Sequence, residues 1–341
     1  MTTLKRASDQ LFERSPDERF GSLQELREHC SREKRFSTDH WQPPQKLRPQ
    51  ASGGEVTVSL DSGETHRLSD WSFSQLCRLA GVSKETINRL TPETASRALR
   101  ETLPASDKPL QLLATGKSIR SLHGVSYTRL WNDDLLSVVS EFAGDFEPPQ
   151  VGMNGATGLY CGEQDLFAFL IDPTGWIEIE GEAFAPGFFV WNSEVGRRSL
   201  GIQTFWFQAV CQNHIVWDAV QVVEFTRKHT AKVGDGLSEI RRLIERLVAK
   251  RDERRDGFVK VVSTAMKQSL GSDADDVLKT LANEGIPRGL AAKATQLALE
   301  SGRFSIFSLV DALTRLAQEM RYAGDRVEID AKAATLLALA A

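Results

Sequence analysis

The spacing of apolar residues changes near residue 236, and this change most constrains the fold. Between residues 110 and 230, apolar residues alternate with polar ones, as in residues 176–180, or form short runs; both patterns are typical of strands. Further along, Leu237, Ile240, Ile244 and Leu247 recur at helical spacing, and later helices are predicted over residues 273–283, 287–300, 305–322 and 329–340. Strands followed by helices predict an α+β fold. We expect a central mixed or antiparallel sheet with flanking helices, followed by an all-helical C-terminal region.

The 341 residues allow one large domain or two of medium size. Proline and glycine interrupt regular structure, so Pro43-Pro44 and residues 49–54 are predicted to form a linker. Residues 1–50 are rich in charge, and a helix is predicted within them over residues 22–34. We therefore expect a charged, partly helical N-terminal segment at 1–50, an α+β core domain at 51–235 and a helical C-terminal region at 236–341.

Composition narrows the class of protein. The longest apolar stretches are far shorter than the roughly 20 residues of a membrane span, and the first residues are charged rather than typical of a signal peptide. Cys30, Cys77, Cys161 and Cys211 are widely spread, which favours reduced thiols. We therefore expect a cytoplasmic protein without a membrane partner. The sequence has no GxxxxGK[ST] loop, which argues against ATP use.

The densest group of unusual residues lies at 187–198, where an apolar run ends in Asn192, Ser193 and Glu194 before Gly196 and two arginines. Short polar side chains at a bend bond to the local backbone and fix its shape. This pattern favours a turn that ends a strand. The alternative is a polar loop that presents Glu194, Arg197 and Arg198 to a ligand.

Residues 210–217 contain Cys211 and His214 at the CxxH spacing of half a zinc site. A structural zinc site needs a tetrahedral set of ligands, and no second pair of this kind stands elsewhere in the sequence. Cys161 or His229 could complete a site, but a buried cysteine beside a hydrogen-bonded Asn213 is favoured. We therefore predict no metal and no cofactor.

Residues 117–131 interleave cations with aromatic residues. Such a pattern on a sheet suits a single nucleic-acid strand, because phosphates pair with cations and bases stack on rings. A solvated sheet face has the same composition. Acidic residues oppose the nucleic-acid interpretation, since residues 111–200 hold 5 Lys and Arg against 12 Asp and Glu. Further positive charge stands at residues 226–230 and 241–255.

Residues 76–90 have the pattern of a bacterial helix-turn-helix, with Gly81 at the turn and Ser83 as a cap. In such a unit Lys84, Asn88 and Arg89 would enter the major groove of a duplex. A third helix is predicted from Pro92 to Leu103, because proline is tolerated in the first turn of a helix. Two helices that meet at a glycine also occur for packing alone, and basic residues are sparse here. Binding of a specific duplex sequence therefore remains an alternative.

The motif Asn192-Ser193-Glu194-Val195-Gly196, followed by residues 200–204 and Val210-Cys211-Gln212-Asn213, resembles the phage/plasmid-like proteins grouped as domain of unknown function 932. The resemblance extends from Trp71 to about Ala265. Its family pattern usually has Gly after Asn213, where this chain has His214. The resemblance implies a mobile-element protein with a role in DNA replication, recombination or conflict with the host. The expected core also looks like that of single-strand annealing proteins.

We therefore predict a non-enzymatic, homo-oligomeric protein that binds single-stranded DNA and assists annealing or recombination. The predicted contact residues are Arg120, Tyr127, Arg129, Arg197, Arg198, Arg227, Lys228 and His229. The family-motif residues are Asn192, Ser193, Glu194, Gly196, Cys211 and Asn213. The alternatives are a duplex-binding regulator that uses residues 76–90, a metal-dependent nuclease that uses Glu194 with Glu163 and Asp165, and a protein-binding scaffold.

Overall fold

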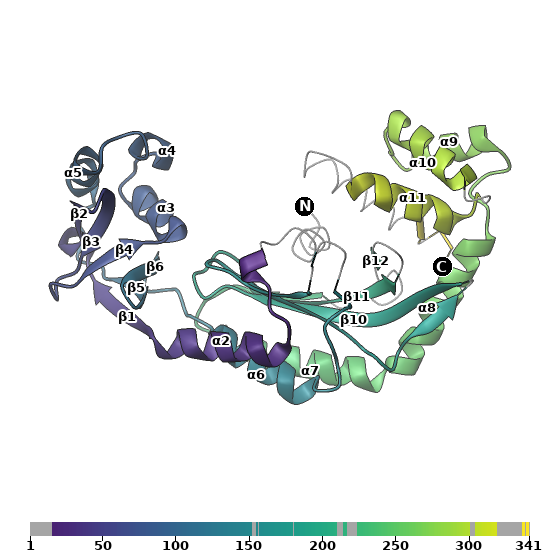
Figure 1. The fold of residues 1–341 in the computed structure, drawn as a ribbon, viewed down its shortest axis with the longest axis horizontal. Coiled ribbons are helices and arrows are strands. Elements are labelled where there is room, and N and C mark those ends of the chain that lie inside the picture. Colours follow the sequence, from purple (N-terminus) through teal and green to yellow (C-terminus); the bar gives the residue numbers. More distant parts are fainter. Residues whose placement is uncertain are drawn as a thin grey trace.

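The computed structural model of this chain describes residues 16–151, 155, 157–179, 181–209, 214–216, 224–300, 304–318, 336–337 and 339–340. This part of the chain forms two β-sheets with helices packed on them, which confirms the predicted α+β fold (Figure 1). We call the sheet of β1–β6 the N-terminal sheet and the sheet of β7–β13 the central sheet.

The N-terminal sheet has the strand order β1-β5-β6-β4-β3-β2 and contains one parallel pair, β4 with β6. Its strands are β1 (Ser37–Gln42), β2 (Arg48–Ser52), β3 (Glu55–Ser59), β4 (Thr65–Leu68), β5 (Leu110–Thr115) and β6 (Ser118–His123). The short 3₁₀ helices η1 (Pro16–Glu18) and η2 (Pro44–Lys46) precede β1 and β2, respectively. Because β1 pairs with β5, the sheet joins residues on both sides of the boundary expected at residue 50.

The linker predicted at Pro43-Pro44 and residues 49–54 was wrong for its second part, because residues 49–52 belong to strand β2 of the N-terminal sheet. Gly53 and Gly54 both have positive φ, 61° and 80°, and they form the turn between β2 and β3. Pro49 is tolerated because β2 is an edge strand, where the missing N–H breaks no ladder. The proline and glycine residues therefore mark a hairpin rather than a break between domains.

Three helices pack on the N-terminal sheet: α3 (Asp70–Leu79), α4 (Lys84–Ile87) and α5 (Pro92–Thr102). Ser69, Ser83 and Thr91 cap them, each side chain accepting a backbone N–H of the first turn. Gly81 separates α3 from α4 with φ 68°. The two helices predicted on either side of Gly81, and the third from Pro92, are confirmed.

The central sheet has the strand order β12-β11-β10-β8-β7. In addition, β13 pairs with β11 and β9 pairs with β10, and every one of these pairs is antiparallel. Its strands are β7 (Leu159–Cys161), β8 (Leu166–Ile171), β9 (Ile177–Ile179), β10 (Glu182–Asn192), β11 (Leu200–Ala209), β12 (His214–Val216) and β13 (Glu224–Arg227). All six residues of β8 are buried, as its continuous apolar run predicts.

Three helices cover one face of the central sheet: α2 (Leu23–Arg35), α6 (Asn132–Phe142) and α7 (Asp235–Ala249) (Figure 1). Leu166, Ala168 and Leu170 of β8 share a core with them. The alternate residues Phe167 and Phe169 belong to an aromatic cluster instead, as the period of two in a strand requires.

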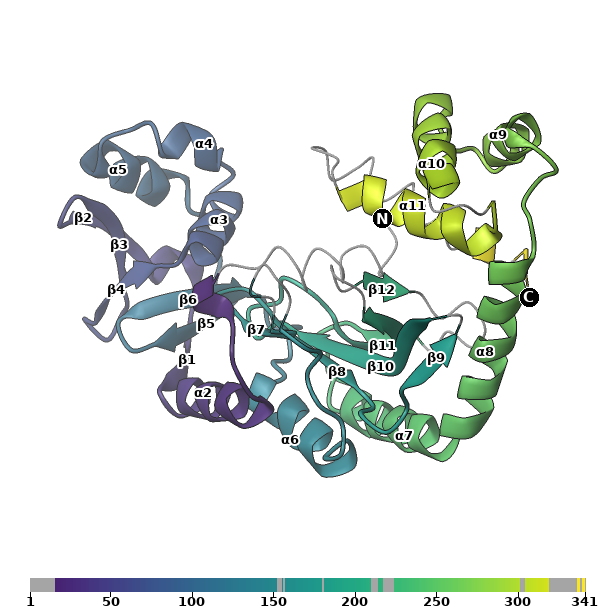
Figure 2. The same ribbon diagram turned by 45° about the vertical axis from the view of Figure 1, so that its right-hand side comes forward.

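The remaining described helices are α8 (Arg251–Lys267), α9 (Ala274–Asn283), α10 (Arg288–Glu300) and α11 (Ile306–Gln318). They form a separate core with Phe184 and Trp206 of the central sheet, in which Trp206 stacks on Phe258 at 3.8 Å. Figures 1 and 2 show these helices and the N-terminal sheet at opposite ends of the central sheet.

Helices predicted for residues 273–283 and 287–300 are confirmed, and α11 confirms part of the one predicted for 305–322. Gly285 has φ 76°, the left-handed conformation expected after a helix. Most of the helix predicted for residues 329–340 lies outside the described residues. In the part of the chain that the structure describes, no helix combines the length and apolar character needed to cross a membrane.

Candidate functional site at the junction of the two sheets

The two sheets meet at residues 192–198, which we call the junction turn. It follows the end of β10, and Gly196 gives it a bend with φ 69°. The carbonyl of Val195 accepts hydrogen bonds from Trp71 Nε1 at 2.8 Å and from His123 Nε2 at 3.0 Å. Ser193 Oγ accepts the backbone N–H of Arg197 at 2.9 Å and donates to the carbonyl of Gln164. The junction turn is thus bonded to α3, β6 and the β7–β8 loop.

Glu194 is buried at the centre of this junction, with 1% of its side chain exposed. One carboxylate oxygen accepts from Arg120 Nη1 at 3.0 Å, and the other accepts the backbone N–H of Asn132 at 2.9 Å. Burial raises the pKa of Glu194, while the Arg120 charge and the Asn132 N–H act in the opposite direction. These contacts join the central sheet to β6 and to the start of α6.

Asn192 has an architectural role in the same place. Its Nδ2 donates to the carbonyl of Leu130 at 2.9 Å and to Asn132 Oδ1 at 2.8 Å, and the side chain is completely buried. Together with the contacts of Ser193, this arrangement matches the first interpretation of the motif, a turn that ends a strand. Cys211 and Asn213, the other motif residues, lie outside the described residues.

Arg120 points into the protein because β6 contains a β-bulge. Ser121 pairs with Leu113 and Ile119 with Ala114, so Arg120 lies between them without a partner in the ladder. A bulge of this kind re-aims a side chain. The Arg120 side chain is 8% exposed and lies 3.5 Å from Glu33 as well as 3.0 Å from Glu194. Burial disfavours its charge, but Glu194 and Glu33 outweigh that effect and raise its pKa.

Arg129 and Tyr127 are also directed inward. Arg129, 4% exposed, pairs with Asp39 Oδ1 at 2.7 Å and donates to the backbone carbonyl of Glu194. The Tyr127 hydroxyl donates to the same carbonyl at 2.8 Å, and burial raises its pKa. The Tyr127 ring stacks on His123 at 3.7 Å and on His229 at 5.4 Å. Burial lowers the pKa of His123 to about 4 and lowers that of His229.

These positions correct the expectation that Arg120, Tyr127 and Arg129 form a solvent-facing contact surface. The two arginines are buried ion-pair partners, and the Tyr127 ring lies between two histidines. His229 is also buried, at 8% exposure. The physical reason is that acids distant in sequence, at positions 33, 39 and 194, neutralise cations that the sequence pattern groups with aromatic residues.

The remaining predicted contact residues lie in the junction turn and at the end of β13. We call Arg197, Arg227 and Lys228, which are at least partly exposed, the outer side of the junction, and the buried Arg120 and Arg129 its inner side. Arg197 is exposed, and its guanidinium lies over the Trp71 ring, 5.2 Å from the centroid. Arg227, partly exposed, pairs with Leu200 in the ladder between β13 and β11, and the exposed Lys228 follows it. Arg198 differs, since it is half-buried, pairs with Asp165 and lies over Phe167. The predicted contact residues therefore divide into cations that are at least partly exposed and cations that are paired with acids.

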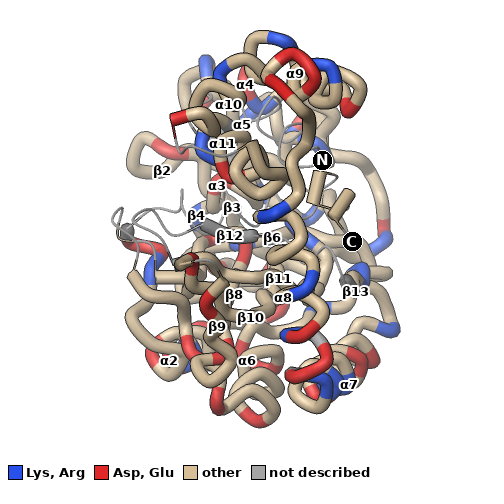
Figure 3. Tube along the Cα trace, turned by 90° about the vertical axis from the view of Figure 1, so that its right-hand side faces the viewer, with Lys and Arg blue, Asp and Glu red and all other residues tan. Residues whose placement is uncertain are grey.

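Four of the basic residues of 241–255 are paired with acids close to them in the chain. Arg241 pairs with Glu245, Arg242 with Glu239, Lys250 with Glu253, and Arg255 with Asp252 and Asp256. Figure 3 shows the resulting mixture of both signs along α7. These residues therefore do not extend a single-sign surface away from the junction.

The duplex-binding alternative depends on α4 as a recognition helix. Within the described chain α4 has only four residues, about one turn, and Lys84 pairs with Asp70 at 2.5 Å. Ile87 is buried in the core under α3 and α5. The corner between α3 and α4 is accounted for by packing, and the geometry does not favour insertion into a major groove.

The nuclease alternative requires carboxylates that converge on a metal. Glu194 is bound to Arg120, Asp165 pairs with Arg198, and Glu163 accepts the backbone N–H of Trp71 at 3.0 Å. Among the described residues, none of these three belongs to a group of converging metal-ligand atoms. The backbone of His214 forms part of β12, but Cys211 of the predicted half zinc site lies outside the described residues.

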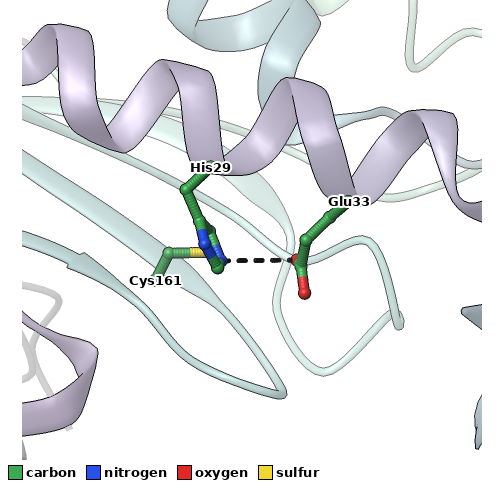
Figure 4. A group of neighbouring side chains, drawn as sticks. All are labelled: His29, Glu33 and Cys161. Carbon is green, nitrogen blue, oxygen red and sulfur yellow. Dashed lines mark ion pairs between the residues drawn. The ribbon is translucent and has the colours of Figure 1, made fainter.

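Two other groups of potential ligands do converge: His29, Glu33 and Cys161, and His40, Glu64 and His66. Figure 4 shows the first of these, with His29 and Glu33 on α2 and Cys161 on β7. The sequence contained a partial signal for it, because His29 and Glu33 are four residues apart on the predicted helix and so share one face. The approach of Cys161 depends on tertiary structure and had no such signal.

No protein-family model, no curated protein and no solved structure matches this chain. The resemblance to the phage/plasmid-like proteins therefore stays a prediction.

Proposed function

We propose that this chain binds single-stranded DNA at the outer side of the junction, through Arg197, Arg227, Lys228 and Trp71. The observation that supports this most is the position of Arg197, exposed above the Trp71 ring. Within the described residues none of the three cations has an acidic partner, in contrast to Arg120, Arg129 and Arg198. Cations that lack acidic partners are available to phosphates.

The ladder between β11 and β13 brings the backbone of Lys228 close to the end of the junction turn, at one corner of the central sheet. The Arg227 side chain lies beside Gly236 at the start of α7. Leu200 is opposite Arg227, and continuing this antiparallel register places residue 199 opposite Lys228. Arg197 is therefore separated from that pair by only the short end of the junction turn. A strand following this corner would pair its phosphates with the cations, and a base could stack on Trp71, an interaction worth about 1–3 kcal/mol.

Assistance of annealing or recombination in a mobile element completes the proposal, together with assembly into homo-oligomers. These parts rest on the resemblance to the phage/plasmid-like proteins. The DNA-binding part rests on the exposed cations and can be tested separately.

The test is a fluorescence-anisotropy titration of a labelled oligo-dT at about 50 and about 300 mM NaCl. Three neutralised phosphates would give a slope of about −2 in log affinity against log salt, or a loss of about 40-fold over this range. Arg197→Ala is expected to reduce the magnitude of the slope by about 0.7 and to weaken binding at both salt concentrations.

Arg97→Ala is the matched control. Arg97 is also exposed, but it pairs with Glu101 on α5, so its loss changes the net charge by the same amount elsewhere. This control should leave affinity and salt slope unchanged. Absence of binding, or equal binding by Arg197→Ala and the wild type, would overturn the proposal. A preference for duplex over oligo-dT would instead support the helix-turn-helix alternative.

A further inference from the structure

The side chains of His29, Glu33 and Cys161 converge where α2 packs against β7 (Figure 4). His29 Nε2 is 3.8 Å from Glu33 Oε2, and each of the three residues offers a ligand atom within 4.8 Å of the other two. The imidazole and the carboxylate come from consecutive turns of one helix, while the thiol comes from a strand 128 residues beyond Glu33. The group therefore joins two separate elements of the fold.

The separation of His29 and Glu33 suits a tetrahedral metal site. Zinc bonds of about 2.0–2.3 Å separate neighbouring ligand atoms by roughly 3.3–3.8 Å. The distance between His29 and Glu33 lies at the upper end of that range. Thiolate and imidazole ligands suit zinc rather than magnesium or calcium, which prefer oxygen ligands alone.

The neighbouring residues orient the three ligands in the way that outer-shell groups of metal sites do. Asn132 Nδ2 donates to Cys161 Sγ at 3.8 Å, and Arg120 Nη1 lies 3.5 Å from Glu33 Oε2. The Phe20 ring packs against His29 at 5.0 Å between centroids. His29 and Glu33 are each about 30% exposed on the side chain, which leaves a path from solvent to the group.

A second thiol lies beside the group, since Cys30 Sγ on α2 is 3.9 Å from Cys161 Sγ. The group itself offers one imidazole, one carboxylate and one thiol, a set of donor types that zinc sites in proteins use.

We propose that His29, Glu33 and Cys161 bind one Zn²⁺ and that the ion fastens α2 to the central sheet. Binding replaces the proton of the Cys161 thiol, which leaves to solvent, and no oxidation or reduction takes place. The site is separate from the cations of the outer junction, so it stands whether or not the chain binds DNA.

Cobalt substitution tests the site directly. Chelator-treated protein in a reducing buffer is titrated with Co²⁺, and the thiolate-to-cobalt charge-transfer absorption is recorded. The wild type should bind one Co²⁺ per chain with this absorption, and one equivalent of Zn²⁺ should displace it. Zn²⁺ should also raise the unfolding temperature, since a ligand that binds only the folded state stabilises it. Cys161→Ser should abolish the absorption, and His29→Gln should weaken Co²⁺ binding at least tenfold.

Cys77→Ser is the matched control, because Cys77 is another buried free cysteine but lies on α3 under the N-terminal sheet. This variant should keep the absorption. His66→Gln tests the second group, which has no thiol and cannot give the charge-transfer band. The half-exposed position of His29 keeps that variant informative if Cys161→Ser does not fold. The proposal is overturned if the wild type shows no band, if the band survives in Cys161→Ser, or if His29→Gln binds as well as the wild type.

Discussion

The inner and outer sides of the junction use arginine in opposite ways. On the inner side, Arg120 and Arg129 are buried against Glu194 and Asp39. On the outer side, Arg197 is exposed over Trp71 and has no acidic partner among the described residues. All three stand near aromatic residues in the sequence or the structure. The comparison shows that the acids that approach a cation, rather than its aromatic neighbours, decide whether it holds the fold together or is available to a ligand.

The largest expected effect comes from breaking the inner ion pair. Arg120→Met leaves Glu194 buried without its cation, and such a change costs about 3–5 kcal/mol in the free energy of unfolding. Denaturant unfolding followed by circular dichroism measures this loss. Glu194→Gln added to Arg120→Met should recover a large part of it, because neither side chain then has an uncompensated charge. A loss under about 1 kcal/mol for Arg120→Met would contradict a structural role for the pair.

The second-largest effect on stability is expected at Gly196, where the junction turn bends. Gly196 has φ 69°, and a Cβ there would lie 2.6 Å from His123 Cε1 and 2.9 Å from Tyr127 Cε2. Gly196→Ala therefore combines backbone strain with overpacking, for a loss of about 3 kcal/mol in stability. Gly116 has φ 56° and no atom within 4 Å of such a Cβ.

Gly116→Ala is therefore the control for Gly196→Ala, since it tests backbone strain without the clash. It should cost about 1–2 kcal/mol in the same denaturant experiment. If the two variants lost equal amounts of free energy of unfolding, the junction turn would accommodate a side chain at position 196. Such a result would contradict the close packing of Gly196 against His123 and Tyr127.

A smaller effect should appear in the pH dependence of stability. Burial, followed by the Arg129 charge, lowers the pKa of His123 to about 4. A lowered pKa means that the unfolded chain binds the proton first, so this contribution to stability is present above about pH 6.5 and is lost as pH falls through about 4. The effect is on the order of 2 kcal/mol, because His123 is partly exposed.

His123→Gln keeps a donor for the Val195 carbonyl but does not titrate. Thermal unfolding at a series of pH values should therefore show a flatter curve between pH 6.5 and 4 for the variant than for the wild type. The lowered pKa of His229 acts with the same sign, so some slope should remain. Curves of equal slope would contradict the burial of His123 as a cause of acid sensitivity.

Local rules predicted much of the fold. Ser22, Ser83 and Pro92 marked helix starts correctly because capping and proline geometry act within one turn. The glycine at 196 marked a bend for the same reason. Strand β2 was missed because it contains Pro49 and is followed by Gly53 and Gly54. Only the pairing of β2 with β3 distinguishes this edge strand and its hairpin turn from a linker.

The candidate site was predictable only where it depends on nearby residues. The junction turn was found from residues 192–198, but the burial of Arg120 depends on a bulge in β6 and on Glu33 and Glu194. Asp39 approaches Arg129 from 90 residues earlier in the chain. Likewise, the spacing of His29 and Glu33 is local, whereas Cys161 reaches them only through packing. Long-range contacts of this kind are set by the sheet topology, which the sequence alone did not define.

The smallest expected effect on stability is that of Arg197→Ala. It gives the strictest test of the comparison between the two sides, because the neighbouring residue, Arg198, can be replaced in the same way. Arg197→Ala removes an exposed side chain that has no ion pair with any described residue, so the free energy of unfolding should change by less than about 0.5 kcal/mol. Arg198→Ala removes the half-buried partner of Asp165 and should cost about 1–2 kcal/mol. Binding of oligo-dT should show the reverse order, with the larger loss for Arg197→Ala. If Arg198→Ala weakened binding more than Arg197→Ala at a temperature where both are folded, the division between an inner structural side and an outer binding side would be wrong.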